Sequence, residues 1–129
     1  MAVNRSSLSA GEIIRKVLLA DPEVAARTNK VYPVVVDEAK LPYIVYRRTQ
    51  LEQSPIKGRQ GADTIGIEII CYTAKYLEGI ELAEAVRGAL DGATAELDGL
   101  VMRSCYLVDS EEGWADDAYA QQLVFNIKI

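Results

Sequence analysis

The amino-acid sequence predicts an α+β fold in which a mainly antiparallel sheet of about five strands carries two helices on one face. Two observations lead to this prediction. Apolar residues alternate along one long strand, Thr64 to Thr73, and a helical pattern over Lys75 to Leu90 follows directly. Four other runs have strand-like composition and one earlier run is helical, so the predicted order is αβββαββ.

The segment from Thr64 to Gly92 is the part around which the rest of the chain is organised. Side chains at every second strand position share one face of a sheet, and those at three- and four-residue steps share one face of a helix. Gly92 stands where a helix end favours a left-handed residue. Each large aliphatic side chain buried between strand and helix contributes about 1.5–3 kcal/mol. The expected core residues are Ile65, Ile67, Ile69 and Cys71 on the strand and Gly79, Leu82, Ala83, Val86 and Leu90 on the helix.

The N-terminal region predicts a helix followed by two strands. Ser9 and Glu12 have the spacing of a capping box, and the helix should end at Asp21, because the residue before a proline leaves the α region. Residues 22–26 allow another short helical turn. Two strands then follow, Val31–Val36 at a sheet edge, because it contains a proline, and Tyr43–Leu51.

Two long polar segments interrupt the remaining pattern. Residues 52–61 form a long predicted hairpin loop with basic side chains and two glycines. After a connector at 93–99 and a strand at 100–108, residues 109–117 form a predicted acidic loop that carries the single tryptophan. Alternation over 119–129 predicts a last strand with one buried face.

Composition is that of a globular protein. The 129 residues are half hydrophobic and predict a single domain spanning 1–129. The net charge of −5 disfavours a nucleic-acid partner, whose binding depends on Lys and Arg. No apolar run has the length of a membrane span, and the start lacks a signal peptide, so we expect a protein made and kept in the cytoplasm. Cys71 and Cys105 lie in apolar strands and are predicted to be buried free thiols.

The residue content argues against catalysis. The chain has no histidine, which removes the commonest general base, the usual nucleophile pairs and the ordinary zinc ligands. The acidic loop lacks EF-hand spacing, because Gly113 occupies a ligand position. Gly58 and Gly61 have the spacing of a KH-domain loop, but that loop joins two helices and this one joins two strands. The seven tyrosines make no stripe for base stacking. We therefore predict no catalytic, cofactor-binding or metal-binding residues.

Three pieces of the sequence together resemble the tail-completion (tail-to-head joining, or tail terminator) proteins of long-tailed bacteriophages and prophages. They are Val31-Tyr-Pro, which follows the Ala-Asp-Pro-x-Val ending of the first helix, Leu41-Pro-Tyr-Ile-Val-Tyr, and Ile67-Glu-Ile-Ile-Cys-Tyr-Thr-Ala-Lys-Tyr running into Ala83-Glu-Ala-Val-Arg-Gly-Ala-Leu-Asp-Gly. The similarity extends from about Ile13 to the final strand.

This resemblance implies a structural subunit that forms a ring, typically a hexamer, at the head-proximal end of the tail. There it would end the tail tube and join it to the head connector. The alternative is a small cytosolic ligand-binding or regulatory domain with a ferredoxin-like sheet. Heterologous ring contacts need two different surfaces, and the two long polar segments are suitable. The predicted interface residues are Ile56, Lys57 and Arg59 in the first segment and Glu111, Glu112, Trp114 and Asp116 in the second.

Overall fold

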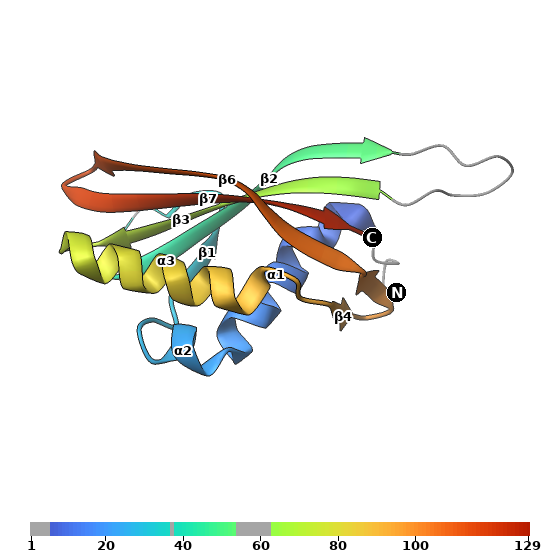
Figure 1. Cartoon of the computed structure of the whole chain (residues 1–129), viewed down its shortest axis with the longest axis horizontal. Helices are drawn as coiled ribbons and strands as arrows, with labels where there is room; N and C mark the ends of the chain where they lie inside the picture. The colour runs from blue at the N-terminus through green and yellow to red at the C-terminus, as the bar shows by residue number, and fades with distance from the viewer. Residues whose placement is uncertain (1–5, 37, 54–62) are drawn as a thin grey trace, which may run out of the picture.

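The computed structural model describes residues 6–36, 38–53 and 63–129, and it places a five-stranded sheet over a layer of helices (Figure 1). The strand order is β1-β2-β3-β7-β6, and β4 and β5 form a separate two-stranded sheet. The elements are η1 (Ser7–Ser9), α1 (Ala10–Ala20), α2 (Pro22–Ala25), β1 (Val31–Pro33), β2 (Tyr43–Gln53), β3 (Asp63–Thr73), α3 (Tyr76–Leu90), β4 (Ala95–Leu97), β5 (Leu100–Met102), β6 (Ser104–Ala115) and β7 (Ala118–Lys128).

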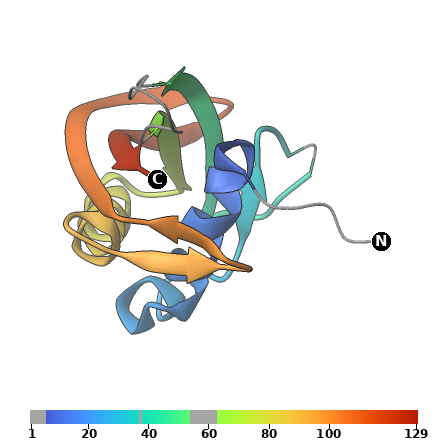
Figure 2. The ribbon, with the colours of Figure 1, turned by 90° about the vertical axis from the view of Figure 1, so that its right-hand side faces the viewer.

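The structure confirms an α+β fold with a mainly antiparallel sheet, because all pairings in the large sheet are antiparallel except β1 with β2. The predicted element order αβββαββ was incomplete. The chain also forms the short helix α2, predicted only as an optional helical turn, and the hairpin β4–β5, whose first strand lies in the predicted connector and whose second strand was predicted as the start of the strand at 100–108. Figure 2 shows this hairpin across the end of the helix layer, where Leu100 and Met102 are buried.

The core lies between the sheet and the helices α1 and α3, as the sequence pattern predicts. The predicted strand residues of β3 are fully buried, as are Phe125 and Ile127 on β7, and Leu123 is 4% exposed. On α3 the buried residues are Gly79, Leu82, Val86 and Leu90. Gly92 has a φ of 81°, which confirms the left-handed helix end. Both cysteines are free and buried.

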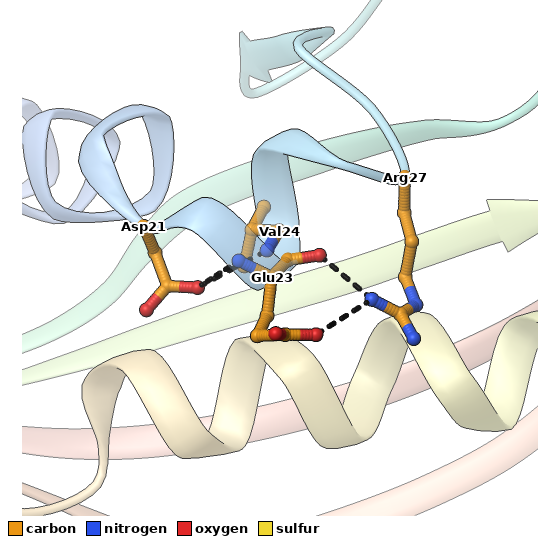
Figure 3. Close-up of polar contacts among 4 residues, drawn as sticks. All are labelled: Asp21, Glu23, Val24 and Arg27. Carbon is orange, nitrogen blue, oxygen red and sulfur yellow. Dashed lines mark hydrogen bonds and ion pairs between the residues drawn. The ribbon is translucent and has the colours of Figure 1, made fainter.

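The start of α1 differs from the prediction. Ser9 makes no side-chain hydrogen bond as a cap, because the chain enters the helix from η1, so the predicted capping box with Glu12 was wrong. The prediction that this helix ends at Asp21 is correct, and the same residue starts α2. Its carboxylate accepts hydrogen bonds from the backbone N–H groups of Glu23 and Val24 (Figure 3). Arg27 closes the turn by donating to the backbone oxygen and the carboxylate of Glu23.

The predicted strand at 100–108 also differs from the structure. The run 100–108 is divided at Arg103, where β5 leaves to pair with β4 and β6 begins to pair with β7. Near the start of the sheet, β1 is shorter than predicted because Val34 takes a φ of 61°, although its place at the sheet edge is as expected. No helix in the described ranges is long and apolar enough to cross a membrane.

Candidate functional site

The acidic segment is the tip of a regular hairpin, so the prediction of an acidic loop at 109–117 was wrong. Strand β6 continues to Ala115, which pairs with Ala118 of β7. Asp116 and Asp117 between them have φ values of 52° and 59°, the left-handed pair of a two-residue type I′ turn. This turn has the twist of the flanking strands, so the acidic side chains project from a continuous ladder.

Three aromatic residues gather where this hairpin meets the start of α3, and we call Tyr76, Trp114 and Tyr119 the aromatic patch. Trp114 and Tyr119 are cross-strand partners with ring centroids 4.9 Å apart at an interplanar angle of 80°. Tyr76 adds a second edge-to-face contact to Tyr119 at 5.8 Å. Trp114 is 59% exposed and Tyr76 46% exposed. Exposed aromatic side chains that hold one another in place suit a protein interface.

A carboxylate is fixed beside the patch. Glu112 accepts a hydrogen bond from the Tyr76 hydroxyl at 2.9 Å and another from Nε2 of Gln121 at 2.9 Å. The bond from Gln121, followed by the one from Tyr76, lowers the pKa of Glu112 below its ordinary value. The hydrogen bond between Tyr76 and Glu112 also raises the pKa of Tyr76. The hairpin therefore presents a negative charge with a defined position next to two exposed aromatic rings.

A second aromatic group lies on the outer face of the sheet, opposite the helices. Tyr43 and Tyr72 are cross-strand partners 5.0 Å apart, and Tyr32 lies 6.2 Å from Tyr43. The expectation that the tyrosines make no stripe was therefore wrong for these three, because the β2–β3 register brings two of them opposite each other. Partial burial, followed by the nearby Asp116 carboxylate, raises the pKa of Tyr43.

A polar network crosses the middle of the same outer face. Glu68 accepts hydrogen bonds from Nε of Arg47 at 2.9 Å and from Nε2 of Gln122 at 2.6 Å. These hydrogen bonds join side chains of β2, β3 and β7 across the outer face. Within the described ranges, no three His, Cys, Asp or Glu side chains are grouped closely enough to hold a metal ion.

The structure brings four of the predicted interface residues together and does not describe the other three. Glu111, Glu112, Trp114 and Asp116 all belong to the β6–β7 hairpin. The remaining three, Ile56, Lys57 and Arg59, fall outside the described residues. Gln53 and Asp63, which flank them in sequence, lie at the opposite end of the sheet from the β6–β7 turn (Figure 1).

Sequence reasoning missed Tyr76, Tyr119 and Gln121 as parts of this site. A signal was available, because the alternation along β7 extends back through Gln121 to Tyr119, and a two-residue turn before it pairs Tyr119 with Trp114. The place of Tyr76 depends on the angle between α3 and the sheet, which has no signature in a single sequence.

The comparisons with known proteins agree with this fold. The family model described as tail completion protein gp17 matches residues 12–129. Among solved structures, the fold is similar to a chain of the virion of a native gene transfer agent particle. That match has a TM-score of 0.75 and 22% sequence identity, and it covers 95% of this chain and 98% of the other. The comparison with curated protein sequences found no match.

The family match covers almost the whole chain, including every element of the large sheet. It confirms the resemblance that the three sequence pieces indicated. The chain therefore belongs to the tail completion protein gp17 family, and it is a structural protein of the phage tail in the virion.

Proposed function

We propose that this chain is the subunit of a ring at the head-proximal end of the tail, where it ends the tail tube and joins it to the head connector. The whole chain, 1–129, acts as one domain in this role, and six copies form the ring. The subunit contacts copies of itself, the tail-tube protein and the connector protein. It performs no catalysis and needs no cofactor.

The observation that carries this proposal is the aromatic patch on a regular hairpin. Tryptophan and tyrosine at the centre of an interface supply much of its binding energy, and rings that are already held in place lose little entropy on binding. Trp114 leaves more than half of its surface in solvent, at 59% exposure.

The charge distribution supports a head-to-tail arrangement of copies. The hairpin carries Glu111, Glu112 and Asp116, whereas Lys57 and Arg59 are in the segment whose flanking strand ends lie at the other end of the sheet. Opposite charges on different surfaces of one subunit favour heterologous contacts, and such contacts close into a ring when the rotation permits.

The first experiment removes the gene from the phage or prophage that encodes it and examines the particles by electron microscopy. The proposal predicts filled heads and separate tails, and restoration of joined particles by a plasmid copy. Normal joined particles without the gene, or mature particles that lack this polypeptide by mass spectrometry, would contradict it.

The second experiment tests the patch with Trp114→Ala and, as a control, Tyr106→Ala. Tyr106 is 58% exposed on the same strand but pairs with Asn126, well away from the patch. We expect Trp114→Ala to reduce joining at least tenfold, while Tyr106→Ala restores joining like the wild type. Equal complementation by both variants would remove the patch from the interface.

The charged residues are tested by reversal in the same complementation assay. Glu112→Lys and Arg59→Glu should each block joining and leave the folded protein intact by circular dichroism. Glu84→Lys is the control, because Glu84 is exposed on α3. Normal joining by the first two variants would show that these side chains make no contact.

A further inference from the structure

The edge of the sheet beside β2 is covered over only part of its length. Strand β1 pairs with β2 at residues 44–46, and Val34 adds one more hydrogen bond, from its N–H to the backbone oxygen of Tyr46 at 2.7 Å. Strand β2 continues for seven more residues, to Gln53. Within the described parts of the chain, no strand pairs with this second half of the edge.

The register shows which backbone groups point out of that edge. Asp63 exchanges both backbone hydrogen bonds with Ile129, so its N–H and C=O groups point toward β7. Because these groups alternate in direction along a strand, those of Thr64 and Gly66 point toward β2. Their partners on β2 therefore face inward. The β2–β3 register shifts at a bulge between Arg48 and Gln50, and past it the residues whose N–H and C=O groups point outward are Leu51 and Gln53.

The other sheet edge, β6, is capped over its first half. The backbone oxygen of Cys105 accepts a hydrogen bond from the Gly92 N–H at 2.6 Å, and the Leu107 N–H donates to the carboxylate of Asp91 at 3.0 Å. Next along the strand, the Ser110 N–H donates to the side chain of Asp109. These side-chain and loop partners prevent another strand from pairing there.

The tip of β6 is left open. The backbone N–H and C=O groups of Glu111 and Gly113 point toward β7, so those of Glu112 and Trp114 point away from the sheet. Among the described residues, these groups have no partner on that side. The sheet therefore has two open stretches, on different strands, at opposite sides and opposite ends (Figure 1).

The two open stretches differ in charge. The open half of β2 begins with Arg47 and Arg48 and also carries Glu52, whereas the charged residues around the open part of β6 are all acidic. A groove of about 250 Å³ lies beside residues 46–48 of β2, where the covered and open halves of the edge meet, between the start of α1 and the end of β1. A strand added to an edge points alternate side chains to one face, and such a groove can receive them. Its lining includes Leu8, Pro33, Val34, Tyr46 and Arg48, and Leu8 and Val34 are 66% and 65% exposed.

We propose that the β6 tip of a second copy of this chain adds as a strand to the open half of β2. The backbone N–H and C=O groups of Leu51 and Gln53 form hydrogen bonds with those of Glu112 and Trp114 of the second copy, whose Trp114 side chain enters the groove. The sheet thereby continues from one subunit into the next. This inference rests on the proposed ring function and specifies how its neighbouring copies join.

The test distinguishes the contribution of the backbone N–H group from that of the side chain by comparing Leu51→Pro with Leu51→Ala. Proline removes the N–H group that points out of the edge, and an edge position tolerates it without loss of a β2–β3 hydrogen bond. Alanine removes the same side chain and keeps the N–H group. A second matched pair, Glu112→Pro and Glu112→Ala, applies the same comparison at the β6 tip. Each variant is expressed in a host that carries the phage lacking the gene, and joined particles are counted.

We expect each proline variant to give at least tenfold fewer joined particles than its alanine partner, with similar thermal midpoints for the two purified proteins. Equal joining by proline and alanine variants would overturn the strand pairing while leaving the ring function intact. If the phage lacking the gene still joins normally, the proposed function itself fails.

Hydrogen exchange supplies a measurement that does not depend on a proline variant folding. Peptides covering 48–53 and 111–115 should exchange their outward amides within seconds in the isolated wild-type protein and at least tenfold more slowly in purified particles. Peptides from 80–90 of α3 are the control and should change little. Unchanged exchange at both edges in particles would overturn the inference.

Discussion

Gly79 sets how closely the first turn of α3 approaches the sheet beside the aromatic patch. A Cβ atom added there would lie 2.9 Å from Oγ1 of Thr73 and 3.5 Å from Cγ of Gln121. Thr73 is 1% exposed and donates a hydrogen bond to the backbone oxygen of Lys75 at 2.8 Å, so its hydroxyl has little freedom to move. Overpacking of this kind costs about 1–3 kcal/mol. The gain in helix propensity from glycine to alanine is about 0.5–1 kcal/mol. Gly79→Ala should therefore reduce the free energy of unfolding by about 0.5–2 kcal/mol.

Gly88→Ala is the matched control on the same helix. Gly88 is exposed, and no atom lies within 4 Å of an added Cβ, so only the propensity gain remains. This variant should be more stable by about 0.5–1 kcal/mol. Urea unfolding followed by circular dichroism measures both, and each kcal/mol corresponds to about 3–5 °C in Tm for a domain of this size. Equal stabilisation by both substitutions would show that the close approach at Gly79 imposes no constraint.

Three further predictions concern a cap, the thiols and a carboxylate. Asp21→Ala should lower the free energy of unfolding by about 0.5–2 kcal/mol in urea titrations, while Asp21→Asn keeps most of the cap. Burial raises the pKa of both Cys71 and Cys105 from 9.0 to about 12, so the unfolded thiols ionise first and stability should fall as pH rises above about 9. Ellman's reagent at pH 8 should modify neither thiol before urea unfolding and both after it. Tyr76→Phe removes one of the hydrogen bonds that lower the pKa of Glu112, so carbon-13 NMR should show this pKa rising toward its ordinary value.

The sequence was sufficient where one periodic pattern determined both local structure and burial. The alternation along β3 and the helical stripe of α3 specify opposing apolar faces, and the structure buries the strand set from Ile65 to Cys71 completely. The last strand was predicted for the same reason. These predictions succeeded because a shift of one residue in either strand would expose the whole apolar face.

The hairpin tip was misassigned because composition and structure disagree there. A run of acidic residues is typical of a solvated loop, yet Glu111 and Glu112 lie in a ladder held by the register with β7 and a two-residue turn. Asp116 and Asp117 adopt left-handed φ values that short polar side chains tolerate. The decisive information was the pairing partner, which lies after the turn and not within the acidic run.

The main core and the proposed interface occupy different parts of the sheet, so we expect interface substitutions to disturb assembly more than folding. Leu123, Phe125 and Ile127 of β7 belong to the main core, whereas the aromatic patch and the outward amides of β6 lie nearer the β6–β7 turn, beside the first turn of α3. Each open edge offers only a few backbone hydrogen bonds, worth about 0.5–1.5 kcal/mol apiece. A single contact between two free copies should therefore be weak. In the proposed ring every subunit would make two such contacts, and a tail end that holds the copies side by side would raise their effective concentration. Interface substitutions should consequently have large effects on particle assembly and small effects on the size of the isolated protein in solution, and particle counts are the more sensitive measurement.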